Sequence, residues 1–413
     1  MRIFRLELIR VLKTRLTVIL LLASLILSVL MAYLPTTFVE YGSYDAESKW
    51  VEYHGMEAIH QIKMLREAVS GQVMPKTLRE TVEIYQKTLW EYDVKTTYSL
   101  PKEAYYGQIF QYTPFMSRIR ESAMNPDTGM MPGVMEVKAN QEGFYQQCVD
   151  RLDALMKLEQ KEYPSAQDFA SKMYEKVEFP FTYYYGIDSD SLDYQILLIF
   201  ITTIFCAIIA APIFSSDYQT GADDILRCTK HGRFRLGIIK TFSALLICGS
   251  AFLLCVIVYL LICNSLFGWE STKTSMQIIF SVSSLPALNI GQLQIVVTAG
   301  TFISLLAIIS FTLFISSRLN GTVPSLALAI LFCLLPIVVT IALPENIGSW
   351  VRCLLPGGGI GLQNSLLYEL IDFNFLHFGN TSVWMPIAIM VMAVLETPVF
   401  LGLTVYSYCR KKN

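Results

Sequence analysis

Six long apolar runs constrain this chain more than any other feature of its sequence. They cover residues 16–34, 192–214, 237–263, 293–316, 323–343 and 385–408. About 20 mostly apolar residues are enough for an α-helix to cross the hydrocarbon core of a bilayer. Backbone polar groups in lipid have to be satisfied within the segment, so helix is the expected structure of each run. The sequence therefore predicts an all-α integral membrane protein with six transmembrane helices.

The charged residues are distributed unevenly around these runs. Only 16% of the chain is charged, against about a quarter in ordinary soluble domains. Residues 36–193 hold 16 Lys+Arg and 25 Asp+Glu, whereas the rest of the chain holds 16 and 9. The basic residues outside that segment cluster beside alternate ends of the runs, which by the positive-inside rule places both termini in the cytoplasm. The acidic segment is then expected to be extracytoplasmic.

This topology gives a simple domain organisation. We expect a cytoplasmic interfacial helix at 1–15, a first span at 16–34, a helical extracytoplasmic domain at 36–191 inserted between the first and second spans, five spans within 192–408, and a cytoplasmic tail at 409–413. In the inserted domain, Gly and Pro punctuation favours helices near 46–70, 75–98, 102–124, 134–162 and 165–178. The outer segment 344–383 reads as a short helix, a glycine hinge and a second short helix.

The cysteines and histidines indicate no catalytic or metal centre. Most of the nine cysteines lie in or beside the apolar runs, where Cys behaves as a small apolar residue. Cys148 and Cys353 lie outside them, and whether they form a disulfide is left open. His54, Glu57 and His60 share one broad arc of a predicted helix, but ordinary solvated side chains explain them better than a metal site. We therefore expect no metal, no cofactor and no enzymatic activity in this chain.

The polar stretch between the second and third runs, residues 215–240, carries an ordered set of charges. Asp223 and Asp224 lie near its middle, and Arg227 and Lys230 follow. Acids at the start and bases at the end of a helix complement its macrodipole. This order predicts a short surface helix, within a cytoplasmic loop at 215–235. A solvated loop would also explain the basic residues, but it explains the acids on the cytoplasmic face less well.

The same stretch resembles the cytoplasmic loop of type-two ABC exporter permeases. The matching positions are Asp217, Gly221, Ile225–Leu226, His231–Gly232, Arg233 and Lys240. The sequence departs from the family's pattern in having Asp217 in place of Glu, Ala222 in place of Thr or Ser, and no proline before Arg233. The resemblance extends to the whole plan of a basic amphipathic N-terminus, six spans and a large insertion after the first span.

The resemblance implies a function in export across a bacterial cell membrane. The chain contains no phosphate-binding G-x-x-x-x-G-K-S/T loop, so ATP and magnesium would be bound by separate ABC ATPase subunits. A second permease subunit, identical or different, would complete the transporter, which would export a peptide, lipid or hydrophobic small molecule. The surrounding partner is membrane lipid, and no nucleic acid is expected. The residues implied in coupling to the ATPase are Asp217, Gly221, Asp223, Asp224, Arg227, Lys230 and Arg233.

Two further functions are weighed against this one. A membrane enzyme would need acids, bases or metal ligands that converge at one depth, and the sequence offers no such set. A membrane sensor, or a peptide-antibiotic resistance module, would use the inserted domain to bind its ligand. The size of that domain is compatible with this alternative.

Glu396 is an acid near the centre of the sixth run, followed by Thr397 and Pro398. A carboxylate at the bilayer centre costs about 2.5–3.5 kcal/mol on insertion scales, which makes it a candidate for the substrate pathway. The alternative is a structural role, in which Glu396 clamps the bundle through hydrogen bonds to another helix.

Overall fold

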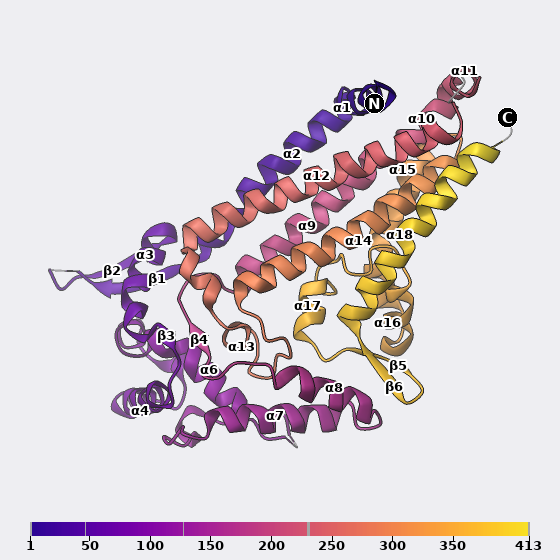
Figure 1. Cartoon of the computed structure of the whole chain (residues 1–413). Helices are drawn as coiled ribbons and strands as arrows, with labels where there is room; N and C mark the ends of the chain where they lie inside the picture. The colour runs from indigo at the N-terminus through magenta and orange to yellow at the C-terminus, as the bar shows by residue number, and fades with distance from the viewer. Residues whose placement is uncertain (1, 46, 127, 229–231, 412–413) are drawn as a thin grey trace.

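The computed structural model describes residues 2–45, 47–126, 128–228 and 232–411. Its long helices run side by side in one elongated bundle (Figure 1). They are α2 (Arg15–Tyr33), α9 (Ser189–Ala210) continued by α10 (Pro212–Thr220), α12 (Phe234–Phe267), α14 (Ile290–Arg318), α15 (Thr322–Ala342) and α18 (Met385–Arg410). Six helices in the described residues are long and apolar enough to cross a membrane, where the apolar runs predicted them. The prediction of a mainly helical protein with six membrane-spanning helices is therefore confirmed.

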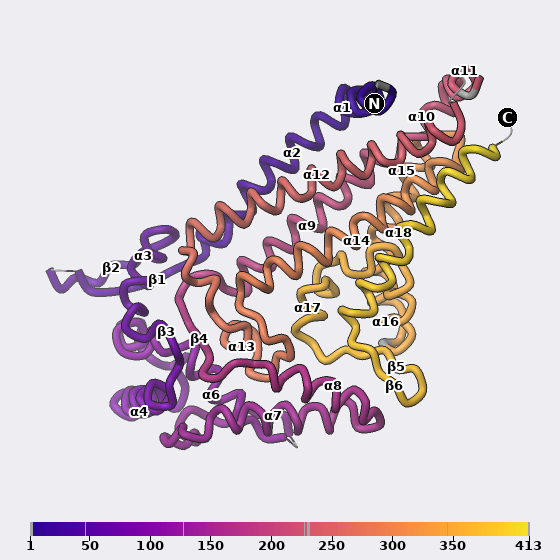
Figure 2. Tube along the Cα trace, in the orientation of Figure 1, coloured from indigo at the N-terminus to yellow at the C-terminus, as the bar shows by residue number. Residues whose placement is uncertain are grey.

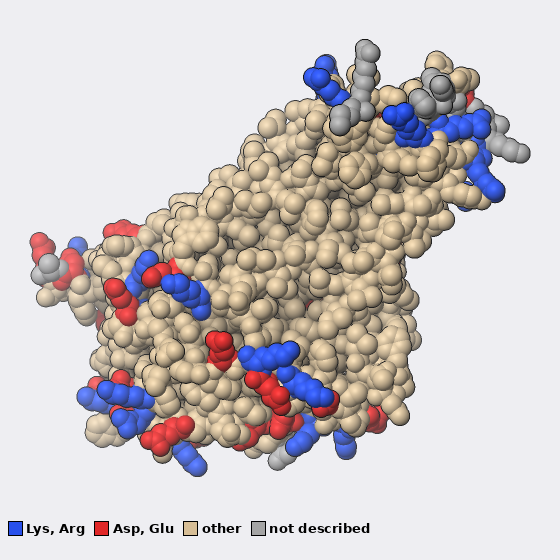
Figure 3. Space-filling model, viewed as in Figure 1, with Lys and Arg blue, Asp and Glu red and all other residues tan. Residues whose placement is uncertain are grey.

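Charged side chains gather at the two ends of the bundle. On the face shown in Figure 3, the middle of the bundle carries almost no Lys, Arg, Asp or Glu. One end, here called the terminal end, holds both chain termini, α1 (Arg2–Leu12) and α11 (Ala222–Arg227). The other, here called the domain end, carries the inserted domain at 36–191. Charged side chains confined to the two ends are expected of a bundle whose middle lies in lipid.

The second span is broken at Pro212, which separates α9 from α10. Proline has no N–H and disrupts the helical hydrogen bonds before it, so polar backbone groups need other partners there. The Ser316 hydroxyl accepts two backbone N–H groups at the start of α10, each at 3.1 Å, and donates to the Ala211 carbonyl at 2.6 Å. Ser325 donates to the same carbonyl at 2.7 Å. Serines of α14 and α15 therefore fix the direction in which α10 leaves α9.

The inserted domain is mainly helical, and its helices are α3 (Gly55–Arg66), α4 (Pro75–Glu91), α5 (Lys102–Ala104), α6 (Thr113–Ser122), α7 (Phe144–Glu159) and α8 (Pro164–Tyr174). A π-helical turn, Tyr105–Ile109, follows α5. Two antiparallel strand pairs accompany them: β1 (Glu40–Tyr44) with β2 (Trp50–His54), and β3 (Gly71–Gln72) with β4 (Thr182–Tyr183). An insertion built largely of helices is what the sequence predicted, and the two small strand pairs are additions to it.

Several expected helix boundaries in the inserted domain are wrong: the helix expected to reach residue 98 ends at Glu91, the one expected at 102–124 is divided, and two others begin late. The helix expected from residue 46 starts only at Gly55, because Trp50, Val51 and Tyr53 belong to β2. Aromatic and β-branched residues favour a pleated strand, and here they pair in register with β1. The helix expected from residue 134 starts only at Phe144, after a 3₁₀ turn and a loop that ends at Gly143.

The inserted domain is attached to the bundle through the connection between α12 and α14. The Ser275 N–H donates to the Thr182 carbonyl at 2.8 Å, and the Tyr174 hydroxyl donates to the Val282 carbonyl at 2.5 Å. Figure 2 shows this connection, which includes α13 (Met276–Ile279), lying between the ends of the long helices and the domain. A motion of α12 or α14 at the domain end would therefore reach the inserted domain directly.

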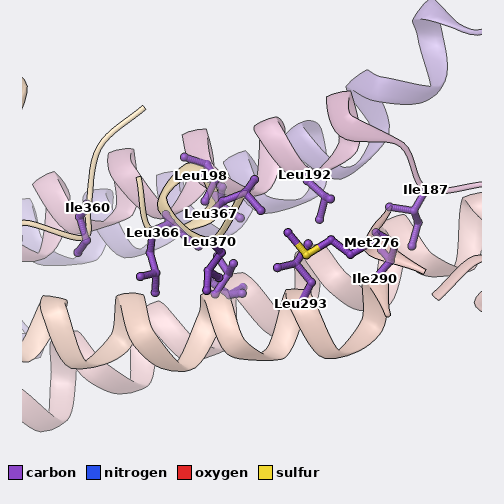
Figure 4. Close-up of a cluster of buried hydrophobic side chains, with 14 of the residues drawn as sticks. Ile187, Leu192, Leu198, Met276, Ile290, Leu293, Ile360, Leu366, Leu367 and Leu370 are labelled. Atoms are coloured by element: carbon purple, nitrogen blue, oxygen red, sulfur yellow. The ribbon is translucent and has the colours of Figure 1, made fainter. Parts of the chain in front are cut away.

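The segment between α15 and α18 folds back against the bundle. It contains α16 (Glu345–Cys353), a glycine-rich turn at 357–361 and α17 (Leu366–Ile371), as predicted, and then a hairpin of β5 (Phe375–Phe378) and β6 (Thr381–Trp384) that was not predicted. Leucines of α17 lie between α9 and α14, in the same buried cluster as Leu192, Leu198 and Leu293 (Figure 4). Gly300 of α14 permits this approach, because a Cβ there would overlap the Leu366 side chain.

We expect Gly300→Ala to lower the thermal stability of the purified protein. Leu366 is fully buried, and forcing an extra methyl group into a packed site costs about 1–3 kcal/mol. Gly402→Ala is the matched control, since a Cβ at Gly402 meets no atom within 4 Å and alanine favours helix. Equal melting temperatures for the two variants would show that α17 is not packed against α14 at Gly300.

Candidate functional site

Four charged side chains from three helices meet at the terminal end. Glu7 and Arg10 come from α1, Asp217 from α10 and Lys240 from α12. Arg10 Nη1 lies 2.7 Å from Asp217 Oδ1, and Arg10 Nη2 lies 2.5 Å from Glu7 Oε1. Lys240 Nζ donates to Asp217 Oδ2 and lies 3.8 Å from Glu7 Oε1. We call this group the charge cluster.

Three members of the charge cluster are almost completely removed from solvent, whereas the Arg10 side chain is 39% exposed. The exposed fraction is 1% for Lys240, 5% for Asp217 and 7% for Glu7. Such burial is strongly unfavourable for single charges and tolerable only when opposite charges compensate each other. Two acids and two bases balance here. Burial alone would lower the pKa of Arg10, but the attraction of Asp217 and Glu7 outweighs it and raises the pKa, so the guanidinium stays charged.

The position of the charge cluster along the helices is compatible with a membrane. Lys240 lies in the second turn of α12, and Asp217 in the last turn of α10. A helix as long as α12 extends about 50 Å at 1.5 Å per residue, whereas the hydrocarbon core is about 30 Å thick. The ends of α12 therefore project beyond the hydrocarbon core, and the charge cluster lies near one of those ends.

Immediately beyond Asp217, the chain turns at Gly221 into α11. Gly221 has φ +70°, a left-handed conformation that glycine adopts without steric cost. The predicted short helix is thereby confirmed as α11, and it has Asp223 and Asp224 in its first turn. Asp223 is 2% exposed, whereas Asp224 is exposed and Ile225 is 75% exposed. The outer face of α11 thus combines an acid with an apolar side chain.

The structure separates the residues that the resemblance implied in coupling. Asp217 and Asp223 are buried, whereas Asp224 and Arg233, the residue before α12, face solvent. Arg227 is the last residue of α11, and Lys230 lies outside the described residues. The buried coupling residues, Asp217 and Asp223, can only hold the helices in place. The exposed ones, Asp224 and Arg233, can contact a partner protein.

Glu396 is half-buried near the middle of α18. It is not part of the charge cluster, whose residues come from α1, α10 and α12. Its neighbour Thr397 donates back to the Ala393 carbonyl at 2.8 Å, and Pro398 follows inside the helix. Within the part of the chain that the structure describes, Glu396 has no hydrogen-bond or ion-pair partner. If Glu396 clamped two helices together, it would need a hydrogen-bond partner on the second helix. The structural role therefore gains no support, and the role of Glu396 in a substrate pathway stays a prediction.

A second buried ion pair lies near the domain end. Arg352 of α16 donates to Glu369 of α17, and both are less than 5% exposed. The pair holds the two short helices together around the glycine-rich turn. Asn374 Nδ2 also donates to Glu369 at 3.2 Å, which ties the hairpin β5–β6 to α17.

An amphipathic cavity of about 560 Å³ lies beside these short helices. Its apolar wall comes from α9 and α15 and includes Ile196 and Ile337. Its polar side includes Asp193, which accepts a hydrogen bond from the Tyr368 hydroxyl at 2.7 Å, and Asn364. Volumes of about 300–1,000 Å³ with a few polar groups are typical of small-molecule sites. The cavity is therefore suited to an amphipathic molecule.

Cys148 and Cys353 are both buried free thiols, so the disulfide that the sequence left open is not formed. Across the described residues, no group of three or more His, Cys, Asp or Glu side chains is arranged to hold a metal ion.

The sequence pointed to Asp217 and Lys240 but missed the partners that α1 supplies. The signal was present: Glu7 is the one acid in the basic N-terminal stretch, and Arg10 lies one turn beyond it. An acid at i and a base at i+3 lie on one helix face, but nothing local indicated that this face would meet α10.

No protein family, no curated protein and no solved structure matches this chain significantly.

We predict that Asp217→Asn and Lys240→Met each lower stability and that the double variant recovers much of the loss. Removing one partner of a buried ion pair costs about 3–5 kcal/mol, because the other charge stays buried, whereas removing both charges leaves no uncompensated charge at that position. The double variant leaves Glu7 and Arg10 paired with each other. Thermal unfolding of all four proteins in one detergent gives the coupling energy.

The exposed pair of Lys172 and Asp168 on α8 serves as the control for this comparison. Its single substitutions should change stability by less than about 1 kcal/mol. Additive losses at Asp217 and Lys240 would contradict the existence of the buried pair.

Proposed function

We propose that this chain is the membrane subunit of an ATP-driven exporter, a permease that is moved by separate ATPase subunits. The observation that carries the proposal is the arrangement at the terminal end. There, α11 exposes Asp224 and Ile225 to solvent while the buried charge cluster braces the helices on both sides of it.

These contacts connect α11 mechanically to several spans. A force applied to α11 passes through Gly221 into α10, which is bound to α1 and α12 by Asp217 and to α14 and α15 by the serines at the Pro212 break. Packed helices respond to such a force by rigid-body movement rather than by continuous deformation. A partner that pushes α11 would therefore tilt several spans together.

The amphipathic cavity supports a transported molecule with an apolar body and a polar head. Asp193, Asn364 and Tyr368 offer one charged and several hydrogen-bonding groups beside the apolar side chains of α9 and α15. This chemistry fits a peptide, a lipid or another hydrophobic small molecule. Because α9 continues into α10, movement at α11 would reach the wall of this cavity.

In this proposal both termini lie in the cytoplasm, and the inserted domain lies outside a bacterial cell membrane. The support is the excess of basic residues at the terminal end and of acidic residues in the inserted domain. ATP and magnesium are bound by the ATPase subunits, and this chain supplies no cofactor site. A second permease subunit, identical or different, completes the pathway.

The proposal predicts that Ile225→Glu weakens the association with an ATPase. The substitution places a second acid beside Asp224 on the exposed face of α11, and folding should be unaffected because the side chain is 75% exposed. The measurement is vanadate-sensitive ATP hydrolysis in the complex purified from native membranes through a tag on this chain. We expect a loss of roughly tenfold, the effect of about 1.4 kcal/mol of interface energy.

Leu158→Glu on α7 is the matched control, since Leu158 is 65% exposed but lies in the inserted domain. It should keep wild-type ATP hydrolysis. If the wild-type chain purifies without ATPase activity from membranes of its own host, the proposed function is wrong. If activity is present but Ile225→Glu keeps all of it, α11 is not the contact.

A further inference from the structure

The inserted domain contains a pocket that the proposed transport function does not use. Its volume is about 410 Å³, and it lies between α4, α6, the residues around α5 and the 3₁₀ turn at Val134. Four tyrosines line it: Tyr85, Tyr98, Tyr105 and Tyr106. We call it the tyrosine pocket. Its size is within the range of small-molecule sites.

An unusual backbone conformation places two of these tyrosines. Tyr105 and Tyr106 are the first residues of the π-helical turn Tyr105–Ile109. Their ring centroids lie 5.2 Å apart with the rings at 78°. π-helical turns are rare, less stable than α-helix and found frequently at functional sites. Both rings line the tyrosine pocket, although the two residues are adjacent in the sequence.

The other two tyrosines differ in their environment. Tyr85 is buried, and its hydroxyl donates to Thr113 Oγ1 at 3.1 Å, so it forms a fixed wall. Tyr98 is 99% exposed and has no hydrogen bond within the described residues, so its ring stands at the rim. Tyrosine has a large apolar ring and a polar hydroxyl, a combination that suits the boundary between a ligand and water.

The charge of the tyrosine pocket is opposite to that of its domain. Residues 36–193 carry nine more acids than bases, yet Lys102 and Arg120 line the pocket, and none of the described lining residues is Asp or Glu. Lys102 is held by Glu52 at 2.8 Å in an exposed pair. Arg120 has only Nε engaged, on the Pro132 carbonyl at 2.8 Å, and no ion-pair partner in the described chain.

This arrangement of Arg120 is that of a group prepared for an anion. One hydrogen bond from Nε fixes the orientation of the guanidinium, and the terminal nitrogens remain as donors with the fork geometry that matches a carboxylate. The neighbouring Ser117 is exposed and lines the same pocket, so the anion would be reached from solvent.

We propose that the tyrosine pocket binds a small amphipathic anion that combines a flat apolar body with a carboxylate. The tyrosine rings pack against the body, and Arg120 binds the carboxylate with Lys102 nearby. The site lies in the inserted domain, away from α11 and the charge cluster, so it does not depend on the proposed transport function.

The test uses the full-length protein in lipid nanodiscs and fluorine NMR of a defined probe, 3-(4-fluorophenyl)propionate. Binding is measured as broadening of the probe signal, with empty nanodiscs subtracted. The neutral 3-(4-fluorophenyl)propionamide is the matched probe. We expect the carboxylate to bind at least roughly tenfold more tightly than the amide, since a charge-assisted hydrogen bond is lost in the amide.

Two variants locate the binding. Arg120→Gln should weaken the carboxylate probe by roughly tenfold and leave the amide unchanged. Ser117→Trp should abolish binding of both probes by filling the tyrosine pocket from an exposed position. Arg79→Gln is the control, because it removes the same charge from the exposed Arg79–Glu83 pair on α4 outside the pocket.

The proposal is overturned if the carboxylate gives no broadening beyond empty nanodiscs, or if acid and amide bind equally. It is also overturned if Ser117→Trp keeps full binding, or if Arg79→Gln loses as much as Arg120→Gln. Circular dichroism and unfolding curves show that each variant is folded. None of these results depends on whether the chain associates with an ATPase.

Discussion

The buried contact between Asp217 and Lys240 is the interaction on which the terminal end of this protein depends. Lys240 is 1% exposed, and an ammonium group in that environment is tolerated only beside a compensating charge. Asp217 supplies it, and Arg10 and Glu7 complete a neutral set. Because the four residues come from three helices, the electrostatic requirement is also a geometric one: α1, α10 and α12 have to lie together.

Two other contacts extend this local requirement to the rest of the bundle. Ser316 and Ser325 satisfy the backbone at the Pro212 break, and so join α10 to α14 and α15. At the other end, α17 inserts leucines between α9 and α14 (Figure 4), and the pair of Arg352 and Glu369 holds α17 to α16. The exposed α11 is thus mounted on a framework whose parts are connected from one end to the other.

The sequence predicted the parts of this fold that depend on local pattern and not those that depend on distant pairing. Apolar runs specified the six long helices, and the charge order around Asp223 specified α11. The contact of Arg10 with Asp217 joins residues 207 positions apart, and no local signal gives such a pairing. The strands β2 and β5 were missed because a few aromatic and branched residues do not distinguish strand from helix until a partner strand is placed beside them. The same limit hid the tyrosine pocket, whose walls come from four separate segments.

Hydrogen–deuterium exchange of the Lys240→Met variant tests most directly whether the charge cluster holds the terminal end together. The amides of α1, α10 and α11 should lose protection together relative to the wild type, because Asp217 is left buried without Lys240. The amides of α16 and α17 at the domain end should exchange as before. Unchanged protection in α1 and α11, or a loss confined to the turn of α12 around residue 240, would contradict this account.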